Sequence, residues 1–314
     1  MIDETAPIPR GRPRKTSDVV ARSPACRPLR DLYEWAESEG VGSWEQVEDR
    51  FLAAMSEFDT TLAATALNPE SEAARSVAGD LQNGKGDFFN DLLALLLENC
   101  SGIEDLYARS SVPGLIVETH NLDGVYPSTG EIGFLLEAKM MGTPRHALNP
   151  KQKERGRPGS ADINKRVKEL AFKAIDLKGE HSRRRTAQGG KPADGGPGGG
   201  DLSTWLHANP PRIYFFVGAR VVSDADFKLL LRWCSAAQQV VDAVGVFCYE
   251  PVGDSLTTYR RKAGVPTDLA IERVLYRACL DLRQLHQSAQ RGPAMVENES
   301  QPGLEPLAPP HDGS

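Results

Sequence analysis

The stretch LDGVYPSTGEIGFLLEAKMMG, residues 122–142, holds two short apolar runs separated by a turn signal. Asp123 lies in the first run, and the second run ends in Glu137, Ala138 and Lys139. Charged side chains are costly to bury unless they are paired or bind a ligand. Either the core tolerates an ion pair at this point, or these residues carry out chemistry.

The spacing of these charges favours chemistry. Side chains alternate between the faces of a β-strand, so Glu137 and Lys139 share one face while Ala138 takes the other. The turn at 127–130 folds the preceding strand alongside, and we expect Asp123 to lie near Glu137. Two carboxylates on adjacent strands repel each other unless they share a cation, and such oxygen ligands suit Mg²⁺. We therefore predict that Asp123 and Glu137 bind Mg²⁺ and that Lys139 orients or helps to deprotonate an attacking water.

A plainer interpretation stands beside this one. Glutamate and lysine separated by one residue are common at the ends of ordinary surface strands. In that interpretation Asp123 is a turn residue before Gly124. The apolar run directly before Glu137 and the helical segments on either side favour the catalytic interpretation.

The periodicity of apolar residues changes several times along the chain and predicts its elements. Helical spacing covers 31–78 with a break at 40–43, and then 87–98, 162–177, 223–243 and 268–287. Runs typical of strands cover 114–119, 121–126, 131–139, 212–218 and 244–250. This order predicts an α/β protein with a buried mixed sheet and helices on both faces.

Over roughly residues 87–251 the sequence resembles the PD-(D/E)XK nuclease superfamily, the fold of most type II restriction endonucleases. That family has an αβββαβ core with an aspartate on the second strand and (D/E)-x-K on the third, which match Asp123, Glu137 and Lys139. Leu122 directly precedes the aspartate, so the proline of the family's motif is absent. The resemblance implies a Mg²⁺-dependent nuclease that leaves 5′-phosphate and 3′-hydroxyl ends.

In the same family an acid on the first helix often assists catalysis. Glu98 matches that role, and Asp91 is a competitor. A different nuclease motif, the His-Asn-His type, would use His120, Asn121 and His146, but no suitable helix carries its last ligand. We interpret His120 instead as a polar group beside the strand, near the phosphate.

A basic segment near the N-terminus resembles an AT-hook, whose Arg-Gly-Arg-Pro core lies in the minor groove of AT-rich DNA. Glycine lets the backbone approach the groove floor, proline fixes an extended path, and the arginines enter the narrow groove. The segment consists of Arg10, Gly11, Arg12, Pro13, Arg14 and Lys15. A second core, Arg155, Gly156, Arg157 and Pro158, lacks the basic flank. Contacts to phosphate are expected from Lys165, Arg166, Lys168 and Lys173.

Charge is strongly segregated along the chain, although the net charge is −6. Residues 1–30 carry 7 Lys or Arg against 3 Asp or Glu, and residues 149–185 carry 12 against 5. Residues 31–110 carry 4 against 17. The basic blocks predict a polyanionic partner, double-stranded DNA, and the acidic block is not expected to contact it.

Composition divides the chain into a basic tail, an acidic helical region, a core and a second tail. We expect a disordered tail over 1–28, helices over 29–80, a nuclease core over 81–290 with a flexible insertion at 179–206, and a disordered tail over 291–314. The chain has no run of 18 apolar residues and no apolar signal segment, so we expect a cytoplasmic protein without a membrane partner. Its five cysteines form no Cys-x-x-Cys pair, which argues against a zinc site or a disulfide framework.

Together these features predict a Mg²⁺-dependent DNA endonuclease of the type II restriction class. Cutting both strands favours a homodimer. Two alternatives stay open. One is a repair or recombination nuclease of the same fold, and the other is a non-catalytic DNA-binding protein with an AT-hook.

Overall fold

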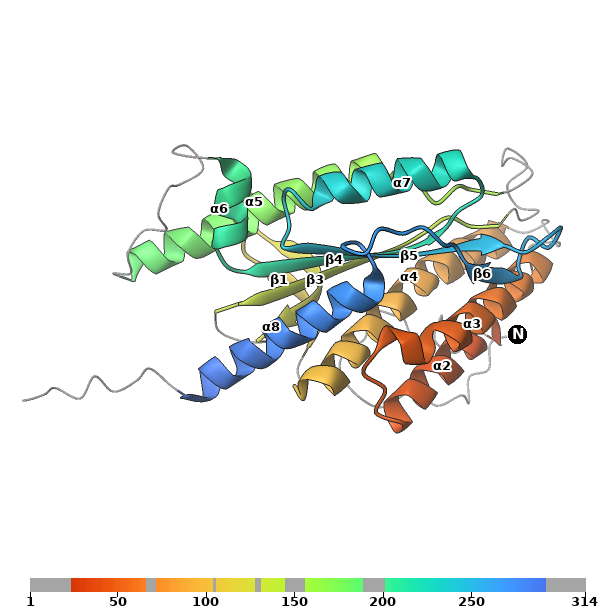
Figure 1. Cartoon of the computed structure of the whole chain (residues 1–314), viewed down its shortest axis with the longest axis horizontal. Helices are drawn as coiled ribbons and strands as arrows, with labels where there is room; N and C mark the ends of the chain where they lie inside the picture. Colours follow the sequence, from red (N-terminus) through yellow and green to blue (C-terminus); the bar gives the residue numbers. More distant parts are fainter. Residues whose placement is uncertain are drawn as a thin grey trace, which may run out of the picture.

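The computed structural model describes residues 24–65, 72–103, 106–127, 131–144, 156–188 and 201–291. It is a mixed α/β structure in which helices cover both faces of a sheet (Figure 1), as predicted. Its strands are β1 Tyr107–Val112, β2 His120–Tyr126, β3 Phe134–Met141, β4 Arg212–Arg220, β5 Ala243–Pro251 and β6 Tyr259–Arg261. Its helices are η1 Pro24–Cys26, α2 Arg27–Ser38, α3 Trp44–Thr65, α4 Glu72–Ser101, α5 Ile163–Ala187, α6 Leu202–Ala208, α7 Asp224–Ala237 and α8 Ile271–Arg291.

The sheet has six strands in the order β1-β2-β3-β4-β5-β6. The first three strands are antiparallel, β3, β4 and β5 are parallel, and β6 returns antiparallel to β5. In the β2–β3 hairpin, Gly124 pairs with Leu136 and Tyr126 with Phe134. The turn signal in the sequence therefore predicted the hairpin that positions Asp123 beside β3.

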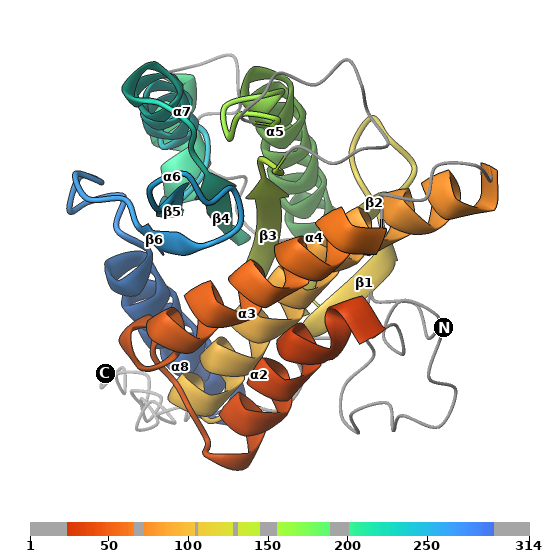
Figure 2. The ribbon, with the colours of Figure 1, turned by 90° about the vertical axis from the view of Figure 1, so that its right-hand side faces the viewer.

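Two helical layers enclose this sheet. Helices α2, α3, α4 and α8 lie on one side of it, and α5 and α7 lie on the other (Figures 1 and 2). Along β3, Phe134, Leu136 and Ala138 belong to the core on the α4 side, whereas Leu135 and Met141 belong to the core on the α5 side. Strand alternation then directs the side chains at 137 and 139 toward α5.

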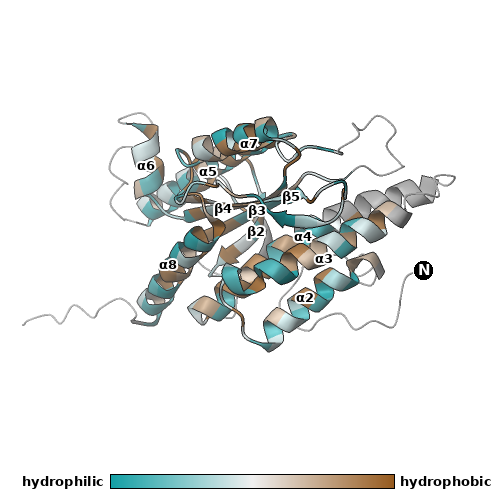
Figure 3. Cartoon of the chain, turned by 45° about the vertical axis from the view of Figure 1, so that its right-hand side comes forward, coloured by the Kyte–Doolittle hydropathy of each residue, from teal (hydrophilic) through white to brown (hydrophobic). Residues whose placement is uncertain are grey.

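The acidic N-terminal helices belong to the same core as the sheet. The Trp44 ring lies 5.1 Å from the ring of Phe51, 6.1 Å from that of Phe89 and 4.8 Å from that of Phe247, measured between centroids. These rings come from α3, α4 and β5. Along α3, α7 and α8, hydrophobic and hydrophilic residues alternate (Figure 3), as expected for helices with one buried face.

Three predicted boundaries are wrong. The predicted strand at 114–119 is a bent segment, and β1 precedes it, ending at Val112. Pro113 and Gly114 interrupt the ladder, and the backbone N–H groups of Ile116 and Val117 donate to the Asp176 carboxylate instead of to a strand.

The second wrong boundary is the start of α4, which begins at Glu72 and not at Asp87. Gly84 and Gly86 favour a break at this point. The helix continues because tertiary contacts hold it: Leu81 is buried, and the buried Lys85 ammonium pairs with Asp59 of α3 at 3.4 Å.

The third wrong boundary is that of the flexible insertion predicted at 179–206, because both ends of this segment are helical. Helix α5 continues through Arg183–Arg185 to Ala187, because Lys178 and Glu180 are buried and paired. Asp201 caps the N-terminus of α6 by accepting hydrogen bonds from the backbone N–H groups of Ser203 and Thr204. The middle of the predicted insertion lies outside the described residues.

Smaller differences occur at the predicted ends of the chain. Residues 24–28 belong to η1 and α2, with Cys26 fully buried, so the N-terminal tail is shorter than predicted. Residues 1–23 and 292–314, with most of both predicted tails, lie outside the described residues. Strand β6 was not predicted, since it has only three residues.

Candidate active site

Asp123, Glu137 and Lys139 meet at one point on the sheet. The Lys139 Nζ lies 3.1 Å from the Asp123 Oδ2 and 3.4 Å from the Glu137 Oε2. Both carboxylates are 4 % exposed, and the Lys139 side chain is 32 % exposed. The hairpin thus brings together the three residues that the sequence analysis selected, on one face and with one cationic group between two carboxylates.

Backbone contacts fix the position of Asp123. The backbone N–H of Ala138 donates to the Asp123 Oδ2 at 2.8 Å, across the β2–β3 pair. From the other side of the sheet, the Asn90 side-chain amide of α4 donates to the Asp123 carbonyl at 3.1 Å. The carboxylate therefore stays aimed at Lys139 and does not need that ammonium to hold it in place.

The carboxylates also set the charge of Lys139. Burial lowers the pKa of the Lys139 ammonium, but the charges of Asp123 and Glu137 outweigh burial and raise that pKa above its ordinary value. Without a bound metal, Lys139 is therefore protonated at neutral pH and donates hydrogen bonds to both carboxylates.

A fourth charged residue, Lys173 of α5, completes the cluster. Its Nζ lies 2.5 Å from the Glu137 Oε1 and 3.0 Å from the carbonyl oxygen of Asn121. Lys173 was expected to contact phosphate, and the sequence pattern did not connect it with Glu137. Its position at the edge of the buried stripe that holds Leu170 and Leu177 is the signal that could have found it.

The chemistry of these donors fits Mg²⁺. Asp123 and Glu137 supply hard carboxylate oxygens, and Mg²⁺ is commonly held by one or two carboxylates while it keeps several waters. No group of three or more His, Cys, Asp or Glu residues with metal-binding geometry occurs in the described part of the chain. Two carboxylate oxygens suit a hydrated magnesium ion better than zinc, which prefers nitrogen and sulfur ligands.

Glu98 is not brought to this cluster. Helix α4 approaches Asp123 at Asn90, and Glu98 lies roughly 12 Å further along the helix axis. The next residue, Asn99, donates to the carbonyl of Val41 in the α2–α3 connection. The position of Glu98 therefore does not support an assisting role in catalysis, and the side chain that α4 brings toward the Asp123 backbone is an amide.

His120 pairs with a buried carboxylate. Its Nε2 lies 2.7 Å from the Asp176 Oδ2, and its side chain is buried. The same carboxylate accepts from the backbone N–H groups of Ile116 and Val117 at 2.6 and 3.2 Å. This cluster fastens the β1–β2 connection to α5, and the expected place of His120 near a phosphate stays a prediction.

The predicted DNA-contacting residues that the structure describes lie on the surface and are partly neutralised. Arg157 pairs with Asp162, and both side chains are more than half exposed. Glu169 pairs with Arg166 at 2.9 Å and with Lys165 at 3.8 Å. Arg155 and the AT-hook residues 10–15 lie outside the described residues.

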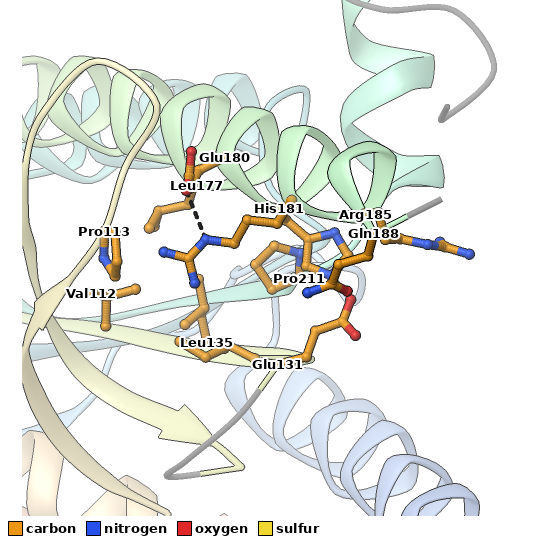
Figure 4. A pocket seen from close by; sticks show the side chains of 12 residues that line it. Val112, Pro113, Glu131, Leu135, Leu177, Glu180, His181, Arg185, Gln188 and Pro211 are labelled. Atoms are coloured by element: carbon orange, nitrogen blue, oxygen red, sulfur yellow. Dashed lines mark hydrogen bonds and ion pairs between the residues drawn. The ribbon is translucent and has the colours of Figure 1, made fainter. Parts of the chain in front are cut away.

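A cavity of about 330 Å³ lies between α5 and the sheet (Figure 4). Helix α5 forms one wall with Leu177, Glu180 and His181, and Leu135 of β3 lies on the other. Leu135 precedes Glu137 by two residues on the same strand face, which separates them by about 7 Å. The cavity has an apolar floor and a charged rim, and none of Asp123, Glu137 and Lys139 lines it.

The charged rim of the cavity is internally paired. Glu180 accepts hydrogen bonds from Arg183 and Arg184 at 2.7 Å. The bond from Arg183 is the largest influence on its carboxyl and, together with Arg184, lowers the pKa of Glu180 to about 2 against the effect of burial. Glu180 is therefore ionised at neutral pH and holds the Arg184 guanidinium at the edge of the cavity.

Comparison of the chain with protein-family models, with curated proteins and with solved structures finds no match. None of the helices in the described residues is long and apolar enough to span a membrane.

Proposed function

We propose that this protein is a Mg²⁺-dependent DNA endonuclease of the type II restriction class. The observation that carries the proposal is the convergence of Asp123 and Glu137 on the Lys139 ammonium, at 3.1 and 3.4 Å. Two buried carboxylates close together are costly without cations, and a divalent cation is the ligand that such a pair suits best.

The element order supports the same proposal. Asp123 lies on β2, and Glu137 and Lys139 lie on β3, the second and third strands after α4. That is the order of the PD-(D/E)XK nucleases that the sequence resembles. The strand order and the contacts among the three residues both support the proposal.

Each side chain has a role in phosphodiester hydrolysis. Asp123 and Glu137 hold the magnesium ion, which when bound polarises a phosphoryl oxygen and favours hydroxide near neutral pH. Lys139 donates hydrogen bonds to the attacking water or to a phosphoryl oxygen, where negative charge develops. The backbone N–H of Ala138 donates to the Asp123 carboxylate across the β2–β3 pair and so keeps that carboxylate in position.

The substrate we propose is double-stranded DNA. Residues 1–30 and 149–185 carry the excess of Lys and Arg noted above, and α5 presents the exposed Lys165, Arg166 and Lys168 beside the site. Phosphate contacts of this kind supply affinity without reading sequence, and the N-terminal segment adds local concentration as a tether. A homodimer accounts for cutting of both strands.

The direct test is cleavage of a supercoiled plasmid by the full-length protein in Mg²⁺. Asp123→Asn, Glu137→Gln and Lys139→Met should each lower the cleavage rate by at least about 100-fold, because the site loses several kcal/mol of transition-state stabilisation. DNA binding, measured by a gel-shift assay without metal, should stay close to wild type. Glu169→Gln removes a surface carboxylate of α5 and serves as the control.

The outcome also separates the alternatives. Discrete fragments support a restriction enzyme, and nicking that depends on DNA structure supports a repair or recombination nuclease. If the wild-type protein binds DNA but cuts no substrate in any divalent metal, the catalytic proposal is wrong. The non-catalytic AT-hook protein then remains.

A further inference from the structure

The two carboxylate oxygens of Glu137 accept hydrogen bonds from different lysines, and Lys173 binds the oxygen that Lys139 does not. The Glu137 Oε2 accepts from Lys139 at 3.4 Å, and the Oε1 accepts from Lys173 at 2.5 Å. A cation that binds Glu137 must therefore displace or share one of the two ammonium groups. Lys139 is also bound to Asp123 at 3.1 Å, so it has a second anionic partner.

Among the described residues, Lys173 has Glu137 as its one anionic partner, whereas Lys139 also binds Asp123. The remaining contact of Lys173 is to the neutral carbonyl oxygen of Asn121. The nearest acids on its own helix already have partners: Glu169 pairs with Lys165 and Arg166, and Asp176 accepts from His120 and the β1–β2 connection. Helix α5 therefore supplies no free carboxylate that would hold Lys173 in place.

We propose that Lys173 is a displaceable counter-ion of Glu137 that couples metal binding to DNA binding. This inference rests on the proposed function. Without DNA, the ammonium occupies the carboxylate oxygen that a divalent cation requires, so the cation binds weakly. A phosphate of DNA entering beside β2 gives Lys173 a new anionic partner, and the Glu137 Oε1 becomes accessible to the cation.

Coupling of this kind is reciprocal. If DNA raises the affinity for the metal by some factor, the metal raises the affinity for DNA by the same factor. Lys173 would then hold the nuclease inactive toward solution metal until a duplex is seated. The positioning role of Lys173 differs from that of Lys139, which stays between the two carboxylates in both states.

The test measures metal binding without catalysis. Isothermal titration calorimetry gives the affinity of the DNA-free, full-length protein for Ca²⁺, a hard cation with the same preference for oxygen ligands. Lys173→Met should tighten Ca²⁺ binding by about fivefold or more. Lys173→Arg keeps the charge and should stay near wild type, and Glu137→Gln should abolish binding.

Two further comparisons control for general charge and for folding. Lys168→Met removes an exposed charge from the same helix and should change Ca²⁺ affinity by less than about twofold, because exposed charges are strongly screened. Lys173→Gln repeats the main test with a polar side chain, should the methionine variant unfold. Thermal melting of each variant shows that it is folded.

The reciprocal arm uses a labelled AT-rich duplex and fluorescence anisotropy. Ca²⁺ should tighten duplex binding by the wild-type protein, and it should do so much less in Lys173→Met. The inference is overturned if Lys173→Met and Lys173→Gln bind Ca²⁺ no tighter than wild type, or if Lys168→Met tightens binding equally. If the wild-type protein binds no Ca²⁺ and cuts no DNA, the proposed function itself fails, whereas Glu137-dependent cutting with unchanged affinities removes the counter-ion role alone.

Discussion

Helix α5 carries two lysines that pair with carboxylates outside the helix, Lys173 and Lys178, and their surroundings differ. Lys178 and Asp242 are fully buried and pair at 2.9 Å. The Lys178 ammonium also donates to the carbonyl oxygens of Leu206 and Asn209, so all three of its donors are used. Lys173 has two acceptors for its three donors and is partly exposed.

The Asp242 end of the buried pair is equally complete. Its carboxylate accepts from Lys178, from the Arg212 guanidinium at 2.9 Å and from the backbone N–H of Ile213 at 2.9 Å. These bonds connect α5, β4 and the start of β5. An ion pair with every donor and acceptor satisfied fixes the fold, whereas the pair at Glu137 leaves a cation with an unused donor at the surface. The comparison thus distinguishes, on one helix, a lysine that stabilises the fold from a lysine for which we propose a role in metal and DNA binding.

The largest stability effect should come from breaking the buried pair. Lys178→Met leaves the Asp242 charge with fewer partners in the interior, and we expect a loss of about 3–5 kcal/mol in the free energy of unfolding. Lys173→Met should cost less than that, because the Glu137 carboxylate, although buried, keeps its contact with Lys139. Urea unfolding followed by circular dichroism measures both. Equal losses in the two variants would contradict the comparison.

We expect an intermediate loss of stability from substituting Asp176, a buried carboxylate whose hydrogen bonds come from backbone N–H groups and His120 and not from a lysine. Burial raises the pKa of its carboxyl, but hydrogen bonds from His120, Ile116 and Val117 outweigh burial and hold that pKa below its ordinary value. Asp176→Asn should cost about 1–3 kcal/mol at pH 7, because it weakens three hydrogen bonds to a charged acceptor.

The pH dependence of this effect has a definite sign. A carboxyl with a lowered pKa contributes its full stability above its ordinary value of about 3.9, and loses it as the pH falls through the lowered value. The difference in unfolding free energy between wild type and Asp176→Asn should therefore be constant near neutral pH and shrink below about pH 4. A difference that grows toward acid pH would contradict the assigned hydrogen bonds.

The smallest effect on stability is expected on the exposed face of α5. Lys165→Gln removes a pair with Glu169 in which both side chains are about half exposed or more, so stability should change by no more than about 0.5 kcal/mol. DNA binding should weaken, and the slope of log affinity against log salt should fall by about 1 if Lys165 contacts a phosphate. Fluorescence anisotropy at several salt concentrations measures that slope, and an unchanged slope would exclude the contact.

Local pattern was enough to predict the β2–β3 hairpin and its charges. Period-two alternation placed Glu137 and Lys139 on one face, and the turn at 127–130 placed Asp123 beside them. These are relations between residues close together in the chain, where backbone geometry alone decides which side chains meet. The same reasoning predicted the mixed sheet with helices on both faces.

Local pattern failed where distant contacts overrule composition. Helices were expected to begin at Asp87 and to end at Leu177, but the buried pairs of Lys85 and Lys178 lie beyond those residues and extend both helices. Glu98 was chosen because the family's first helix often carries an assisting acid, and the packing of α4 shows that Asn90 contacts the Asp123 backbone.

The sequence by itself determined the hairpin and the two carboxylates with their lysine, because alternation and turn chemistry act over a few residues. The tertiary structure decided that Lys173 contacts Glu137 and that His120 forms a hydrogen bond with Asp176. Both contacts join α5 to strands more than thirty residues earlier in the chain. Packing of α5 against the sheet creates them, and no local periodicity encodes that packing.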